Sequence, residues 1–184
     1  MPRTGCGVGS AIPNTYFMRD RKPISDWVAS LLKDEISGRC PKCGKYEGDS
    51  EAFTDHHING KSSISEYWNL IRLCPVCHQK CEDHKGDAKY VREIKRLKAR
   101  LFRNFLGHTT YDLLLRTFEK GSVTTFPFLT RTLIDLGLGR ITQENPMSIG
   151  SAQDRPTFSV YSLTLQGRKW ATELNLSWGP GRKT

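Results

Sequence analysis

The residues best suited to chemistry are cysteines in two closely spaced pairs, Cys40 with Cys43 and Cys74 with Cys77. A Cys-x-x-Cys turn can direct two thiolates at one metal ion, and two such turns complete the tetrahedron that suits Zn²⁺. Because sulfur fills all four positions, no position remains for water, and we expect a structural Zn²⁺ rather than a catalytic one. The remaining cysteines, Cys6 and Cys81, are expected to act as small buried apolar residues.

Between the two cysteine pairs lie further groups that bind metals or move protons. His56 and His57 are adjacent, Asn69 precedes the second pair, and His78 directly follows its last cysteine. Imidazole titrates near neutral pH, so one histidine can accept a proton from water while others hold a divalent cation. Hydrolysis of a phosphodiester needs such a base together with an electrophile that takes up the developing charge. The pattern predicts metal-assisted hydrolysis.

Residues 40–84 resemble the HNH (ββα-metal, His-Me finger) endonuclease family. The matching motifs are His-His-Ile-Asn-Gly-Lys, Asn-Leu-Ile-x-Leu-Cys and Cys-x-x-Cys-His, in the family's order and spacing, over less than a third of the chain. The resemblance implies hydrolysis of DNA phosphodiester bonds by a ββα-metal module. It also implies His57 as the general base, His56 and His78 as ligands of one catalytic cation, and Asn69 as the residue that fixes the loop beside the base.

Two alignments of the histidine motif are open. Alignment on Ile58 makes His57 the base and His56 the ligand, whereas alignment on Asp55 and His56 makes Asp55 the ligand and His56 the base. We favour the first because an apolar residue follows the base in the family pattern; Asp55 would then support a ligand histidine. Two imidazoles suit Mn²⁺, Ni²⁺ or Zn²⁺, whereas Mg²⁺ would depend more on phosphate and water ligands. The expected catalytic cation is Mg²⁺, Mn²⁺ or Ni²⁺.

Local patterns predict the elements that carry these residues. Ser25 as N-cap, apolar residues at helical spacing and Gly38 predict a helix that delivers the chain to Cys40. Strands are expected over 52–58 and 69–73, followed by a helix over 75–83 with proline at its start. A longer helix over 87–105 carries one apolar and one basic stripe. Residues 1–23 lack periodicity and are expected to form an arm.

The last third of the chain resembles a winged-helix module. Helices are expected over 110–119 and 126–136, then a strand through 158–163 that runs into an apolar helix at Trp170. An unrelated α+β cap that only stabilises the rest is the alternative. The predicted fold is α+β, with an N-terminal arm and helix (1–38), an HNH module with its zinc site (39–86), a basic connecting helix (87–107) and a winged-helix-like DNA-binding domain (108–184).

The formal charge of +9 lies in the C-terminal half, because residues 85–184 alone carry a net charge of +9. This distribution favours a polyanion as partner, since each Lys or Arg on a phosphate releases condensed counterions. A merely solvated basic surface is the alternative. The expected DNA contacts are Lys89, Arg92, Arg96, Arg100, Arg103 and Arg131.

These patterns lead to a hypothesis about function. We expect a metal-dependent HNH endonuclease that cuts double-stranded DNA, and the separate reading module favours a site-specific, restriction-type enzyme. Symmetric double cuts would need a homodimer. The alternatives are a zinc-containing winged-helix DNA-binding regulator with an idle nuclease centre, a phage or mobile-element nicking nuclease, and a nuclease of structured RNA. No apolar run approaches the roughly 20 residues of a membrane span, and the start lacks a signal-peptide pattern, so a cytoplasmic (intracellular) location is expected.

Overall fold

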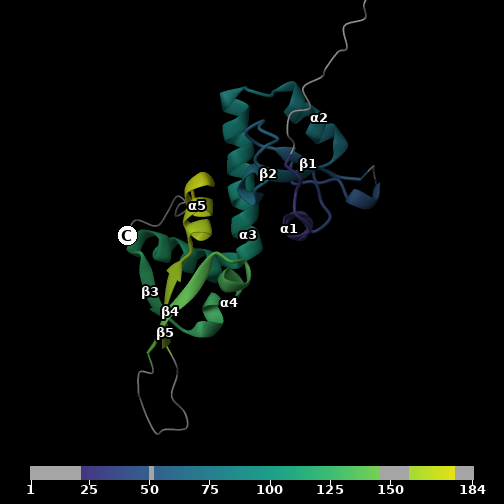
Figure 1. Ribbon diagram of the computed structural model, residues 1–184. Helices are drawn as coiled ribbons and strands as arrows, with labels where there is room; N and C mark the ends of the chain where they lie inside the picture. The colour runs from purple at the N-terminus through teal and green to yellow at the C-terminus, as the bar shows by residue number, and fades with distance from the viewer. Residues whose placement is uncertain (1–21, 50–51, 146–157, 177–184) are drawn as a thin grey trace, which may run out of the picture.

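The computed structural model describes residues 22–49, 52–145 and 158–176, and it combines helices with two small antiparallel sheets (Figure 1). The expected α+β class is confirmed. The arm expected over residues 1–23 lies almost wholly outside the described residues, and Cys6 lies outside them. No helix in the described part of the chain has the length and apolar character needed to cross a membrane.

Helix α1 (Asp26–Ile36) has the boundaries that its capping signals predict. The Ser25 side chain accepts a hydrogen bond from the Val28 N–H at 3.4 Å, which satisfies one of the unpaired donors of the first turn. The helix ends where Ser37 and Gly38 take left-handed φ angles of 48° and 71°. The chain then turns directly into the first cysteine pair.

A two-stranded sheet and a helix follow. Strand β1 (Thr54–His57) pairs antiparallel with β2 (Leu70–Leu73), with His57 opposite Leu70, and short 3-10 helices η1 (Glu47–Asp49) and η2 (Tyr67–Asn69) precede each strand. Helix α2 (Pro75–Asp83) begins at proline. The strand, loop, strand, helix order matches the expectation, although both strands are shorter than predicted because pairing stops where the chain turns toward the cysteines and the loop.

Helix α3 (Ala88–Lys120) runs through two helices that the sequence predicts separately. Asp87 caps its start, and the only non-helical residue inside it is Gly107, with φ 74° and ψ 165°. Glycine adopts this conformation without steric cost, so the chain changes direction there without a loop. In Figure 1, α3 descends from α2 to the second sheet and bends beside it.

The second sheet contains β3 (Ser122–Thr125), β4 (Gly139–Asn145) and β5 (Phe158–Leu163) in the antiparallel order β3-β5-β4. Helix α4 (Pro127–Asp135) lies between β3 and β4, and α5 (Leu165–Glu173) follows β5. The helices and β5 agree with the sequence prediction, whereas β3 and β4 were not predicted. The winged-helix assignment stays a prediction, as do the proposed domain boundaries.

One apolar cluster joins the two halves of the molecule. Trp170 of α5 stacks on Tyr67 with ring centroids 4.4 Å apart and contacts Phe102 of α3 edge-on at 5.8 Å. The cluster also includes buried residues of α1, β2, α4 and β5. A smaller cluster packs β2, α2, α3 and the two residues that flank β1, Phe53 and Ile58, around the cysteines. The sheet of the histidines and the C-terminal sheet are therefore held through a shared core.

A buried ion pair lies inside this shared core. The Lys98 ammonium, with no exposed surface, lies 2.5 Å from Glu35 Oε2 and 3.4 Å from the centroid of the Tyr67 ring. The Tyr67 hydroxyl donates a hydrogen bond to the other carboxylate oxygen of Glu35. Burial lowers the pKa of Lys98 to about 8, against the opposing effect of the Glu35 carboxylate. The pair links α1 to α3 beneath the first sheet.

Removing one partner of this pair tests how much the link matters. We expect Lys98→Met to lower the free energy of unfolding by about 3–5 kcal/mol, because it leaves the Glu35 carboxylate buried without a counter-charge. Glu35→Gln combined with Lys98→Met should recover most of the loss. The exposed Lys89→Met on the same helix is the matched control and should change stability by about 0.5 kcal/mol or less. Urea unfolding measures all three; an unchanged midpoint in Lys98→Met would contradict the prediction.

Candidate functional site

The two cysteine pairs meet at one point. One sulfur atom from each of Cys40, Cys43, Cys74 and Cys77 lies within 4.8 Å of all the others, and Cys43 Sγ is 3.6 Å from Cys74 Sγ. Four sulfurs placed tetrahedrally at about 2.3 Å from Zn²⁺ are about 3.8 Å apart, so the cluster matches such a site. The expected clustering is confirmed, and its donor set is compatible with zinc.

The local backbone favours a thiolate at Cys40. Burial acts to raise the pKa of Cys40, but backbone hydrogen bonds around Cys74, Cys43 and Lys42 outweigh it and lower the pKa to about 7. Burial raises the pKa of Cys77 instead. Cys81, the fifth described cysteine, is buried as expected and lies outside the cluster of four.

A second group of possible metal ligands lies between β1 and α2. His56, His78 and Glu82 each offer one ligand atom, and these three atoms lie within 4.8 Å of one another. The two imidazole rings meet edge-on with their centroids 5.3 Å apart. His78 and Glu82 are separated by one helical turn of α2, so both side chains lie on the same face. The start of α2 is also the second cysteine pair, which links the two clusters through one helix.

Glu82 is the residue of this group that the sequence analysis missed. Its Oε1 is 3.0 Å from His56 Nδ1, and its Oε2 accepts a hydrogen bond from Lys85 Nζ at 3.2 Å. Burial acts to raise the pKa of Glu82, but Lys85 and the nearby histidines hold it below its ordinary value. The sequence signal that could have identified Glu82 is its position four residues after His78, which predicts that both side chains lie on one helical face. The family motifs quoted above do not include this position.

His56 is suited to hold a cation. Burial is the largest cause that lowers the pKa of His56, and the neighbouring His78 and His57 act in the same direction against Glu82. A neutral imidazole is the form that ligates metals, so the environment favours the ligand form at neutral pH.

His57 lies beside a cavity in front of this group. The cavity has a volume of about 630 Å³, and its lining includes His57, His78, Glu82 and the amines Lys22 and Lys85. Successive residues of a strand point to opposite faces, and accordingly His56 is buried against α2 whereas His57 lines the cavity. The cavity therefore combines a titratable imidazole, two possible ligands and two positive charges.

Asp55 occupies a different environment from the three clustered residues. Arg72 Nη1 lies 3.3 Å from its Oδ1 and binds Glu47 through Nη2 at 2.7 Å. Asp55 lines the cavity but is not among the ligand group of His56, His78 and Glu82. Asp55 therefore lies outside the group that could hold a cation, and the choice between the two alignments stays a prediction.

Asn69 ties the loop between the strands to β2. Its Oδ1 accepts a hydrogen bond from the Asn59 N–H at 3.1 Å, and its Nδ2 donates to the Ile64 carbonyl at 2.9 Å. The side chain is fully buried. Both bonds hold the segment that directly follows His57, while a role of Asn69 in catalysis stays a prediction.

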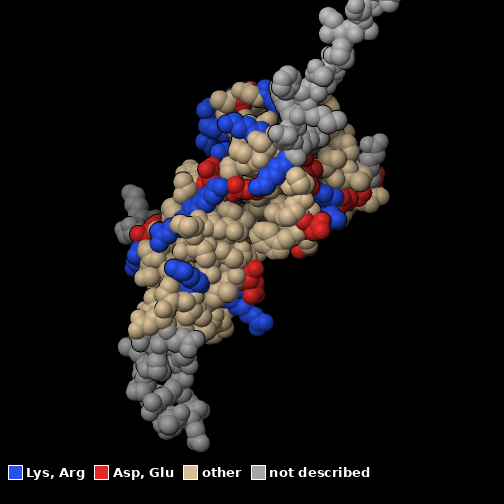
Figure 2. All heavy atoms as spheres, viewed as in Figure 1, with Lys and Arg blue, Asp and Glu red and all other residues tan. Residues whose placement is uncertain are grey.

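The expected DNA contacts fall on three surfaces. Arg92, Arg96, Arg100 and Arg103 of α3 line one groove, described below, whereas Lys89 is exposed nearer the start of the helix. Arg131 lies apart on α4, where it is highly exposed and 3.9 Å from Asp135. Figure 2 shows Lys and Arg side chains gathered over the N-terminal end of α3.

Comparisons of the chain with protein family models, with curated proteins and with solved structures find no match.

Substitution of Asn69 tests whether the loop depends on it. Asn69→Ala leaves the Asn59 N–H and the Ile64 carbonyl without their partner, and we expect a loss of about 1–3 kcal/mol in the free energy of unfolding. Hydrogen exchange at the Asn59 amide should accelerate as well. Asn104→Ala, at an exposed position of α3, is the control and should leave both measurements unchanged. If the Asn59 amide exchanges as slowly in Asn69→Ala as in the unmodified chain, Asn69 does not hold the loop as described.

Proposed function

We propose that this protein is a metal-dependent endonuclease of the HNH type that hydrolyses phosphodiester bonds of DNA. The observation that carries the proposal is the grouping of His56, His78 and Glu82 within 4.8 Å, beside a cavity that His57 lines from the next strand position. The resemblance of residues 40–84 to the HNH family independently implies the same base and two of the same ligands. The ββα order of β1, β2 and α2 supports the same proposal.

The ligand group fits a divalent cation such as Mg²⁺, Mn²⁺ or Ni²⁺. These ions accept two imidazoles and one carboxylate as ligands. His56 Nδ1 lies 3.0 Å from Glu82 Oε1, a separation compatible with adjacent positions on one ion. Glu82 can serve as the third ligand or orient His56 through Nδ1, as carboxylates do for ligand histidines. A bound cation would supply electrophilic stabilisation of the charge that develops on the phosphate and the leaving oxygen.

The chain's own residues account for the other requirements of hydrolysis. His57 accepts the proton of the attacking water, for which an imidazole is suited at neutral pH. Lys22 and Lys85 line the cavity and place positive charge where phosphate oxygens would enter. Asn69 holds the loop after His57 and so limits the movement of the base.

Zinc at the four cysteines has a structural part in this proposal. The first strand pair is only four residues long on each side, and its apolar cluster is the smaller of the two. A metal bound by four thiolates would replace the stabilisation that a larger core supplies. It would also hold the start of α2, and with it His78 and Glu82, against the strand that carries His56.

Cleavage of supercoiled plasmid in Mg²⁺ or Mn²⁺ tests the nuclease assignment. We expect the intact chain to nick or linearise the plasmid, and His57→Ala to lower the rate by about 100-fold or more, because general-base catalysis contributes at least that factor. His108→Ala, at an exposed histidine of α3, should retain the full rate. Equal rates for His57→Ala and His108→Ala would refute the assigned base, and no cleavage by the intact chain with any divalent ion would refute the function.

The zinc site has its own test in the metal content of purified protein. We expect Cys77→Ser to contain about one zinc ion fewer per chain than Cys81→Ser, because only Cys77 belongs to the group of four. Cys77→Ser should also unfold at a lower temperature, since metal binding contributes to folding. Elemental analysis and calorimetry provide the two readouts. The same zinc content in both variants would exclude a zinc ion at this cluster.

A further inference from the structure

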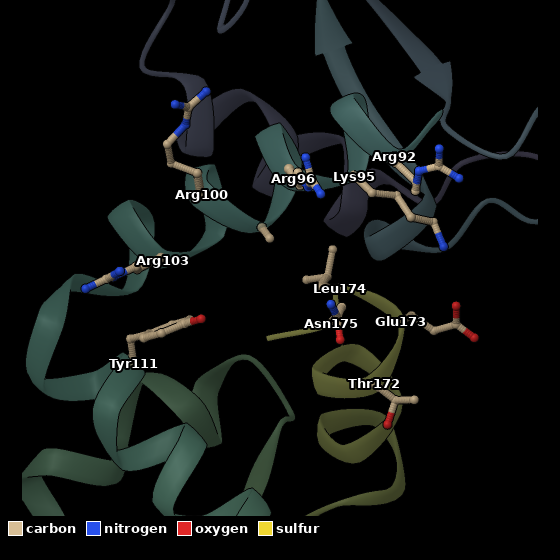
Figure 3. A pocket seen from close by; sticks show the side chains of 11 residues that line it. Arg92, Lys95, Arg96, Arg100, Arg103, Tyr111, Thr172, Glu173, Leu174 and Asn175 are labelled. Carbon is tan, nitrogen blue, oxygen red and sulfur yellow. The ribbon is translucent and has the colours of Figure 1, made fainter. Parts of the chain in front are cut away.

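A basic groove separates the first half of α3 from the end of α5 (Figure 3), and it shares no lining residue with the histidine cavity. Its volume is about 680 Å³. Five cations of α3 line one wall of this groove: Arg92, Lys95, Arg96, Arg100 and Arg103. The four arginines follow one another at intervals of three or four residues, which places them on one face of the helix, and Lys95 lies next to Arg96 at the edge of that face. They form a stripe that extends over about 16 Å, from the helical rise of 1.5 Å per residue.

None of the ion pairs identified among the described residues includes one of these five cations. The ion pairs among the described residues involve other cations, namely those of Arg72, Lys85, Lys98, Arg131 and Lys169, and the protonated form of His56. Arg92, Arg96 and Arg100 are exposed, whereas Lys95 and Arg103 are half-buried. A cleft wall lined by one sign of charge focuses the electric field and attracts counter-ions, so the groove favours a bound anion.

The opposite wall has a different character. It is formed by the end of α5, where Thr172, Glu173 and Asn175 offer hydrogen-bonding groups and a negative charge. Asn175 takes a left-handed φ of 50° just after the helix and lines the groove. Tyr111 and Leu174 add apolar surface between the walls, and Arg103 lies 5.4 Å from the centroid of the Tyr111 ring.

We propose that this groove binds a single-stranded segment of the nucleic-acid substrate, with phosphates along α3 and bases toward α5. A single strand has phosphates on one side and base edges on the other, which corresponds to one cationic wall facing one hydrogen-bonding wall. A duplex presents phosphates on both rims and would set one of them against Glu173. A small anion would use the α3 wall alone. This inference rests on the proposed function, because it names the part of the substrate that is held away from the histidines.

The test measures binding without cleavage, in the full chain carrying His57→Ala and without added divalent ions. Fluorescence anisotropy compares a labelled unpaired DNA oligonucleotide with its duplex and with an abasic strand of equal length. We expect the unpaired strand to bind most tightly. Arg96→Ala with Arg100→Ala should weaken it about 10-fold and reduce the slope of log affinity against log salt by about 1.4, at about 0.7 per lost phosphate contact.

Two further variants separate the groove from general basicity. Arg116→Ala with Lys120→Ala removes the same charge from exposed positions of α3 outside the groove and should change affinity by less than about 2-fold. Asn175→Gly keeps the left-handed backbone favourable and removes the side chain. It should weaken binding of the strand with bases and leave the abasic strand unchanged.

The outcomes distinguish this inference from the nuclease proposal. Equal affinity for duplex and unpaired strand, equal affinity for the abasic strand, or an equal loss in the control pair would each overturn the groove assignment. If the unpaired strand binds no more tightly than the duplex while the unmodified chain still cleaves plasmid, only the groove assignment is refuted. Strand binding as expected, without plasmid cleavage in any divalent ion, would refute the proposed hydrolysis and leave a binding groove.

Discussion

The convergence of four sulfur atoms is the constraint on which the candidate site depends. Cys40 and Cys43 follow α1, whereas Cys74 and Cys77 form the first turn of α2, so their meeting brings the end of one helix to the start of another. His78 comes directly after this turn, and Glu82 lies one turn later. The position of both relative to His56 is therefore determined where the sulfurs meet, more than by the short strand pair itself.

Local signals were sufficient to predict most helices but, in the second sheet, only β5. The N-cap Ser25 and the proline at the start of α2 act within a few residues, and both helices begin where these signals lie. Strand β4 has Ile141 as its only large apolar residue, and its pairing with β5 shifts register after that residue. Its pairing therefore depends on a partner distant in the sequence, which alternation of apolar residues could not indicate.

The candidate site was predictable only where its residues lie close together in the sequence. The cysteines and histidines share a short stretch of sequence, so the spacing of their motifs is enough to predict them as metal-binding residues. Glu82 required the helical face that it shares with His78, and its contact with His56 depends on how α2 packs on β1. The basic stripe of α3 was visible as a helical repeat, but its opposite wall comes from α5, more than 60 residues later in the chain.

The core that Tyr67, Phe102 and Trp170 share has a geometric consequence for how the molecule would handle a long polymer. Because this core packs both halves together, it holds the basic groove at a fixed distance from the histidine cavity. A strand gripped at the first would reach the second only after a set number of nucleotides. If both proposals hold, the bond that is cut would lie a fixed number of nucleotides from the bound single strand, whatever bases lie in between.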